Sequence, residues 1–302
     1  MSRGAVAILV AALGAGAVSR AGAQELEPRA YSPNPTGANF VVVGIGRSTG
    51  DVVTDPSLPF QDVEAKLNQP TLGYSHTLGL FGRSASIGLG VPYVWGSVEG
   101  SVGEEARRIT RSGLADPRLR FAVNLVGGPA LDPREFAARR PRTSLGATVI
   151  VSAPLGQYDP AKLVNLGTNR WAVKGELGVS QPLGRFAAEL YAGGWLYGDN
   201  DDFYGGVRRE QKPVATLQAH VVYTIRPRLW LAGDATFYAG GSTTLDGTPK
   251  NDRQQNSRVG LTLALPVARR QSLKVTWGSG FTTLAGGDFQ TIGVAWQFFW
   301  FN

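Results

Sequence analysis

The stretch that decides the fold is DFQTIGVAWQFFWF, Asp288–Phe301, and only Asn302 follows it. Successive side chains of an extended strand point to opposite faces. One face of this segment is therefore apolar, and the other carries small or polar residues. The first face holds Ile292, Val294, Trp296, Phe298 and Trp300, and the second holds Thr291, Gly293, Ala295 and Gln297. Aromatic residues that gather toward one end are typical of a strand that leaves lipid at the membrane interface.

The same period of two recurs along the chain. In 256–266, Val259, Leu261 and Leu263 alternate with Gly260 and Thr262. Such patterning, interrupted by turn signals, predicts twelve antiparallel strands. The predicted strands are 38–47, 69–81, 84–96, 115–126, 142–153, 170–182, 186–197, 213–225, 229–240, 256–266, 272–282 and 288–301.

Short and long connections alternate between these strands. Gly82-Arg83 and Gly184-Arg185 are short, whereas 48–68, 97–114 and 154–169 are long. A soluble β-sandwich has no reason to sort its loops in this way. The pattern predicts an all-β, antiparallel transmembrane β-barrel of about twelve strands, with long extracellular loops and short periplasmic turns. We expect 48–68 and 97–114 to be able to fold into the barrel.

The segment 127–141 is an exception, because it is long where a turn is expected. Asp132 can cap a helix, Pro133 suits the first helical position, and Glu135 completes the spacing of a capping box. We predict one short helix here. It could be a periplasmic docking point, but an ordered turn is the simpler interpretation.

The N-terminus has the features of an export signal. Arg3 precedes an uncharged run from Gly4 to Ser19, and the small residues Ala21-Gly22-Ala23 follow. We interpret residues 1–23 as a signal peptide, 24–37 as a periplasmic arm that could enter the lumen, and 38–302 as the barrel. The chain has no cysteine, which excludes disulfides and thiolate metal sites.

Charged residues on the predicted strands must face the lumen, since a charge at the middle of the lipid face costs about 2–4 kcal/mol. They could form a selectivity ladder for a solute or a neutralised network that fills a narrow lumen. The aromatic residues Tyr191 and Trp195 share the face of Glu189, unless a bulge at Gly193-Gly194 reverses their direction. The candidate lumen residues are Arg118, Arg120, Lys174, Glu176, Glu189, Tyr191, Trp195, His220, Asp234, Arg258 and Lys274.

Other aromatic residues form two predicted belts near the membrane interfaces. The belt near the long loops holds Trp95, Trp171, Trp195, Tyr197, Tyr238 and Phe281, and the belt near the turns holds Phe81, Phe186, Tyr223, Trp230 and Trp300.

Catalysis and metal binding have little support. The chain has two histidines, and neither His76 nor His220 has a serine two residues away, as a lipid-facing hydrolase would commonly have. The acidic loop 198–202 lacks the spacing of a calcium loop. We expect no enzyme activity, no metal, no cofactor and no nucleic-acid partner.

Several segments resemble the outer-membrane transporter family described as "putative meta-pathway of phenol degradation". They are 29–37, 113–118, 154–159, 165–171 and 178–183. The resemblance spans nearly the whole predicted mature chain. It implies a β-barrel that passes aromatic or other hydrophobic compounds across the outer membrane, and it supplies no set of site residues.

We therefore expect a narrow outer-membrane channel for small hydrophobic or aromatic solutes. The alternative is a barrel that binds surface ligands through its extracellular loops. Expected partners are outer-membrane lipids, a small-molecule solute and the barrel assembly machinery, which would read the C-terminal strand. Asn302 departs from that signal, because such strands most often end on the aromatic residue itself.

Overall fold

The computed structural model of the chain describes residues 26–53, 60–102 and 105–301. The predicted signal peptide, 1–23, and Asn302 lie outside the described residues.

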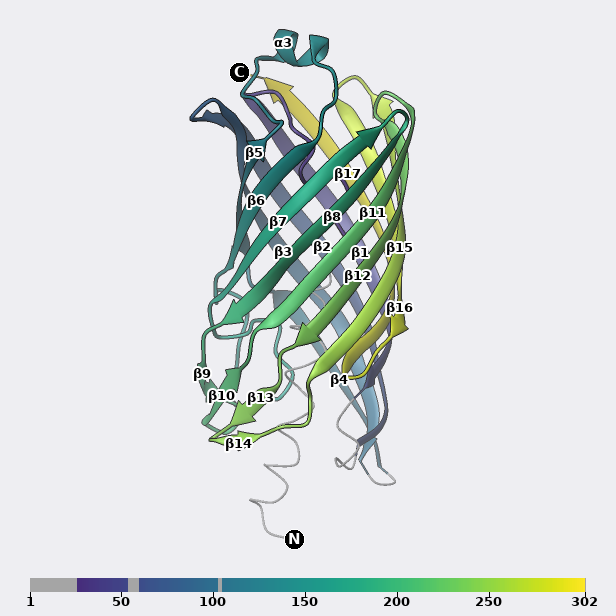
Figure 1. Ribbon diagram of the computed structural model, residues 1–302. Coiled ribbons are helices and arrows are strands. Elements are labelled where there is room, and N and C mark those ends of the chain that lie inside the picture. The colour runs from purple at the N-terminus through teal and green to yellow at the C-terminus, as the bar shows by residue number, and fades with distance from the viewer. Residues whose placement is uncertain (1–25, 54–59, 103–104, 302) are drawn as a thin grey trace.

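The described chain forms a closed, antiparallel barrel of twelve strands, so the predicted fold class is confirmed (Figure 1). β3 continues the ring on both sides, since it pairs with β2 and with β5. The barrel strands are β1 (Ala38–Val53), β2 (Phe60–Leu80), β3 (Arg83–Val102), β5 (Arg118–Val126), β6 (Ser144–Ser152), β7 (Ala172–Leu183), β8 (Phe186–Tyr197), β11 (Val214–Arg226), β12 (Leu229–Gly240), β15 (Gln254–Ala268), β16 (Gln271–Thr282) and β17 (Gly286–Phe301).

The last strand closes the barrel against the first. β17 pairs with β1 from Ala38 opposite Phe301 to Val53 opposite Gly286, without a shift of register. Closure leaves no strand edge exposed to lipid, where an unpaired backbone group would cost several kcal/mol. The segment that predicted the fold is therefore also the one that completes it.

Apolar side chains cover the outer face of the barrel. Leu190, Leu217 and Leu261 are all more than two fifths exposed, as lipid contact requires. Trp171 and Phe281 also point outward near the long loops. Three predicted members of that belt do not belong to it: Trp195 and Tyr238 are 2% exposed and lie inside, and Tyr197 packs against them. Alternation decides this, since an aromatic near an interface faces lipid only in the correct phase of its strand.

The two ends of the barrel differ, and we call them the turn end and the loop end. The turn end carries α3 (Pro133–Ala138) and the C-terminus, at the top of Figure 1. Asp132 accepts hydrogen bonds from the backbone N–H of Arg134 and Glu135, and the Glu135 carboxylate accepts one from Asp132 N. The predicted capping box and helix are confirmed. No helix in the described part of the chain is long and apolar enough to cross a membrane.

The loop end is more regular than the sequence indicates. β1, β2 and β3 extend beyond the barrel, and β4 (Glu105–Leu114) pairs with the projecting part of β3. The expectation that 48–68 and 97–114 could fold inward is therefore wrong for their described residues, which pair as strands; 54–59 and 103–104 lie outside the described residues. Part of the strand pattern is present in the sequence, since Val63, Ala65 and Leu67 alternate with polar residues and are buried in one apolar cluster. A separate sheet at this end consists of β9 (Asn200–Phe203), β10 (Val207–Gln211), β13 (Thr243–Leu245) and β14 (Thr248–Pro249), at the bottom of Figure 1.

Leu261 tests the assignment of the outer face. It lies in the middle of β15 and is 51% exposed. We expect Leu261→Arg to lower the free energy of unfolding by about 2–4 kcal/mol, and Phe281→Arg, near the loop end, by about 0–1 kcal/mol. Guanidinium unfolding in lipid vesicles measures both. Equal losses for the two variants would contradict the assignment.

Candidate functional site

An N-terminal arm, residues 26–37, runs inside the barrel and enters from the turn end. Its main chain is fixed there by Thr36 N, which donates to Leu131 O at 2.8 Å, and by Asn34 O, which accepts from Ser84 Oγ at 3.0 Å. Deeper in the lumen, Arg29 N donates to Glu189 Oε2 at 2.6 Å. The arm has no strand of its own, as its prolines predict. It therefore obstructs the lumen from the turn end.

Tyr31 is the centre of the arm and is 2% exposed. Its hydroxyl donates to Glu176 Oε1 at 3.0 Å, and its ring meets that of Tyr191 edge to face at 4.8 Å. Gly178 and Gly146 make room for the ring: a Cβ on Gly178 would lie 2.0 Å from Tyr31 Cε2, and one on Gly146 would lie 2.4 Å from Cδ1. The wall is shaped to receive this one side chain.

A buried polar network fills the lumen along β7, β8 and β11. Lys174 Nζ lies 2.7 Å from Glu176 Oε2, and both side chains are almost fully buried. Gln218 Nε2 donates to the same carboxylate at 2.9 Å. Glu189 accepts from Tyr191 and from Ser180. These bonds satisfy charges that would otherwise be costly to bury.

The network continues at the boundary of β11 and β12. His220 Nδ1 lies 2.6 Å from Asp234 Oδ1, and Thr262 Oγ1 donates to Asp234 Oδ2 at 2.7 Å. The His220 ring also contacts the Tyr191 ring at 4.9 Å. Together the two groups of side chains occupy one side of the lumen, which we call the filled side (β7, β8, β11 and β12).

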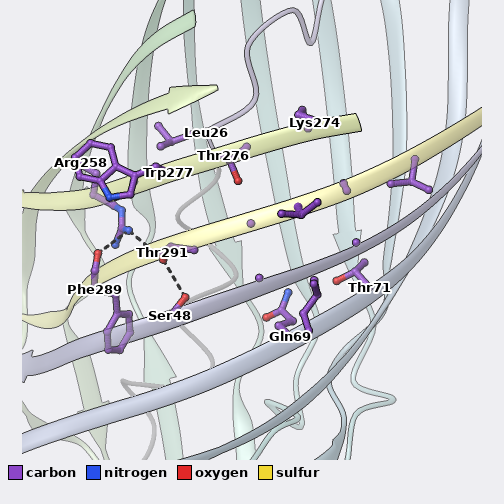
Figure 2. Close-up of a pocket in the computed structure, with 18 residues that line it drawn as sticks. Leu26, Ser48, Gln69, Thr71, Arg258, Lys274, Thr276, Trp277, Phe289 and Thr291 are labelled. Atoms are coloured by element: carbon purple, nitrogen blue, oxygen red, sulfur yellow. Dashed lines mark hydrogen bonds between the residues drawn. The ribbon is translucent and has the colours of Figure 1, made fainter. Parts of the chain in front are cut away.

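The opposite side, formed by β16, β17, β1 and β2, is open. Small residues point inward here, among them Gly44, Gly46 and Gly293, and a cavity of about 320 Å³ lies against them. Figure 2 shows Leu26 of the arm and Lys274 of β16 at this cavity. Small side chains leave space that the arm does not fill, so a solute can be accommodated beside it.

Polar bonds hold the rim of this cavity toward the loop end. Arg258 Nη2 donates to Phe289 O at 2.9 Å, and the hydroxyls of Ser48 and Thr291 lie 2.9 Å apart; Figure 2 marks these contacts. Arg258 is 5% exposed and therefore supports the wall more than it faces the cavity.

A second cavity, of about 180 Å³, lies nearer the loop end. Two arginines stack on two aromatic rings in its wall. The Arg118 guanidinium lies 5.5 Å from the ring centroid of Trp195, and that of Arg170 lies 4.7 Å from Tyr197. The two rings are themselves stacked at 6.4 Å. The wall is both cationic and aromatic.

The loop 153–171 covers this second cavity. Asp116, in the short break between β4 and β5, holds the loop in place. Its Oδ1 accepts from Gly156 N at 2.9 Å, and its Oδ2 accepts from Thr168 N at 2.9 Å and from Thr168 Oγ1 at 2.6 Å. Leu166 is buried in an apolar cluster with residues of β2 and β3. This loop therefore reaches over the lumen.

All eleven candidate lumen residues lie on inward faces. The alternative of a bulge at Gly193-Gly194 is wrong, since β8 pairs with both neighbours without a register shift. Whether a solute contacts these residues remains a prediction. His76 lies elsewhere, at the turn end, where His76 Nδ1 lies 2.9 Å from Asn39 Oδ1.

Sequence reasoning did not find Glu27, Tyr31, Asp116 or Arg170 as lumen residues. Asp116-Pro117 was one available signal, because it interrupts a strand pattern. The acidic loop 198–202 contains Asp199 and Asp201, which pair with Arg208. No cluster of metal-ligating side chains occurs among the described residues.

The alternating faces, the closed ring and the filled polar interior define an outer-membrane β-barrel. The sequence model of the family "Putative MetA-pathway of phenol degradation" matches residues 32–298, and the chain belongs to this family. No curated protein sequence matches the chain.

Solved structures agree with the fold. An outer membrane channel from Pseudomonas putida F1 is 25% identical, with a TM-score of 0.76 over 91% of this chain and 100% of that chain. The transport unit of the autotransporter AIDA-I from Escherichia coli is 9% identical, with a TM-score of 0.51 over 92% of this chain and 93% of that chain. The second likeness shows the barrel fold alone.

A substitution of Gly178 tests whether the packing of Tyr31 against β7 holds the arm in the lumen. We expect Gly178→Val to expel Tyr31, because the new side chain occupies the position of its ring, and to raise single-channel conductance in planar bilayers. Gly175→Val is the matched control: the residue lies on the same strand, and a Cβ there meets no atom within 4 Å. Equal conductance for both variants would show that Tyr31 does not obstruct the lumen.

Asp116 tests the position of the loop. Asp116→Asn replaces one acceptor oxygen by a donor that opposes the N–H of Thr168, so we expect 153–171 to detach. Limited proteolysis of this loop would then accelerate several-fold, whereas Asp201→Asn, on the exposed surface, would leave the rate unchanged. An unchanged rate for Asp116→Asn would show that apolar packing alone holds the loop.

Proposed function

We propose that the chain is an outer-membrane channel that passes small hydrophobic or aromatic compounds into the periplasm. One observation carries the proposal: on the open side of the lumen, small residues leave a cavity of about 320 Å³ beside Leu26 of the arm. A purely structural barrel has no need to leave such a space. The aromatic wall of Trp195 and Tyr197 supports the class of solute.

Membership of the family and the likeness to a solved outer membrane channel support this proposal. The proposal includes export by a cleaved signal peptide, residues 1–23, and recognition of β17 by the barrel assembly machinery. It includes no enzyme activity, because the two histidines serve other contacts: His220 pairs with Asp234 inside the wall network, and His76 bonds Asn39.

The loop end supports a second candidate function, the binding of a surface ligand. The four-stranded sheet β9-β10-β13-β14 and the projecting strands present ordered, charged surface outside the membrane. Loss of adhesion with normal solute uptake in a deletion strain would favour this candidate.

An uptake assay tests the channel. We expect a deletion strain to accumulate radiolabelled phenol and toluene more slowly than the parent, and the full-length protein to restore the rate. Gly178→Val should raise uptake above the parent level, because the arm is displaced, and Gly175→Val should match the parent. Uptake that does not depend on the protein would refute the proposal.

A further inference from the structure

The arm brings a carboxylate into a group of lumen cations. Glu27 Oε2 lies 3.5 Å from Arg120 Nη1. Arg120 exerts the largest attraction on Glu27, and Lys274, Lys174 and Arg118 add to it. These four cations come from β5, β7 and β16, so the carboxylate lies where cations from different sides of the lumen converge. We call them the cation group.

The bond between Glu27 and Arg120 differs from the other ion pair of this group. The side chains of Arg120 and Glu27 are 31% and 43% exposed, whereas those of Lys174 and Glu176 are 3% and 5% exposed. A solute in the lumen can therefore reach the first pair but not the second. Partly exposed pairs are also weaker than well-ordered buried contacts, which makes an exchange of partners feasible.

The second cavity shares Arg118 with the cation group. Arg118 belongs to both, since it lines the cavity and acts on Glu27. Trp195, on which Arg118 stacks, belongs to a buried apolar cluster with Ile150, Val214 and Tyr238. Within the described residues, Trp195 Nε1 is buried and has no hydrogen-bond partner. A cation and aromatic surface thus lie together in the wall of this cavity.

This combination fits a flat apolar body that carries one carboxylate. A guanidinium stacked on a ring still presents its N–H edge, which binds carboxylates through two parallel hydrogen bonds. A neutral compound could use the aromatic surface, but it could not replace the charge of Glu27. An anion can replace it, because the cations then remain neutralised when the arm leaves.

We propose that Arg120, with Arg118 and Lys274, binds small aromatic carboxylates, that the buried Lys174 adds only its charge, and that Glu27 of the arm occupies this site as a built-in competitor. A bound carboxylate displaces Glu27 and so loosens the arm that obstructs the lumen. The inference rests on the proposed channel function and names a solute class for it. By linkage, removal of the Glu27 charge must also strengthen carboxylate binding.

The chain contains no cysteine, so a single introduced cysteine reports on the arm alone. Ser32→Cys places a thiol in the arm near Tyr31. Its rate of modification by a charged thiol reagent measures how often the arm leaves its seat. We expect benzoate to accelerate modification several-fold and in a saturable manner, and benzamide, a neutral molecule of the same shape, to have no effect. Equal effects of the two compounds, or none of either, would overturn the proposal.

Calorimetric titration with benzoate tests the site itself. The Arg120→Gln variant should bind benzoate about tenfold more weakly, because it loses a charge-assisted hydrogen bond. Glu27→Gln should bind more tightly than the unaltered protein, because the competitor is gone. Arg134→Gln, which removes an exposed cation of α3, is the matched control and should bind unchanged. Equal affinities for all three variants would overturn the proposal.

The two functional claims fail separately. If phenol uptake does not depend on the protein but benzoate still releases the arm, the carboxylate-site proposal is upheld and the channel proposal is refuted. If uptake depends on the protein and benzoate acts no differently from benzamide, the channel proposal is upheld and the carboxylate-site proposal is refuted.

Discussion

The pairing of β17 with β1 is the interaction on which the rest of the structure depends. Lipid offers no hydrogen-bond partners, so a membrane sheet must close on itself. Every residue of β1, from Ala38 to Val53, has a partner in β17. Closure forces alternate side chains into a shared interior, and this interior then has to be filled, hydrated or plugged. The polar network, the arm and the cavities are three consequences of that one constraint.

A barrel of twelve strands is wider than one that side chains alone can fill. In this chain the two sides of the lumen are filled in different ways. On the filled side, large polar residues such as Glu176, Glu189 and His220 satisfy one another. On the open side, glycines leave space beside the arm. The arm connects the sides: Tyr31 is seated on the filled side, while Leu26 reaches the cavity of the open side. Obstruction and passage therefore depend on the same twelve-residue segment.

Much of the fold followed from the sequence because a lipid-facing strand must alternate. The strands 186–197 and 229–240 were predicted with the bounds that the structure shows. The projecting strands beyond Arg47 and Gly96 were not, because their glycines and charged residues are as typical of loops as of strands outside the membrane. The inward phase of Trp195 and Tyr238 was also obscured, because an aromatic residue suits an interface as well as a lumen. His76 lies on the same outward face as Leu72 and Tyr74 and bonds Asn39, which is its partner on β1.

By itself the sequence determined the strand number, the antiparallel order, the capped helix at 133–138 and the inward phase of the charges on the predicted strands. These features are local, since each follows from alternation, capping or the cost of a charge in lipid. Only the tertiary structure decided which of those charges meet, that Asp116 holds the loop over the lumen, and that Glu27 and Tyr31 occupy its interior. Such contacts join residues as far apart as Tyr31 and Glu176, and no spacing along the chain encodes the register and tilt that bring them together.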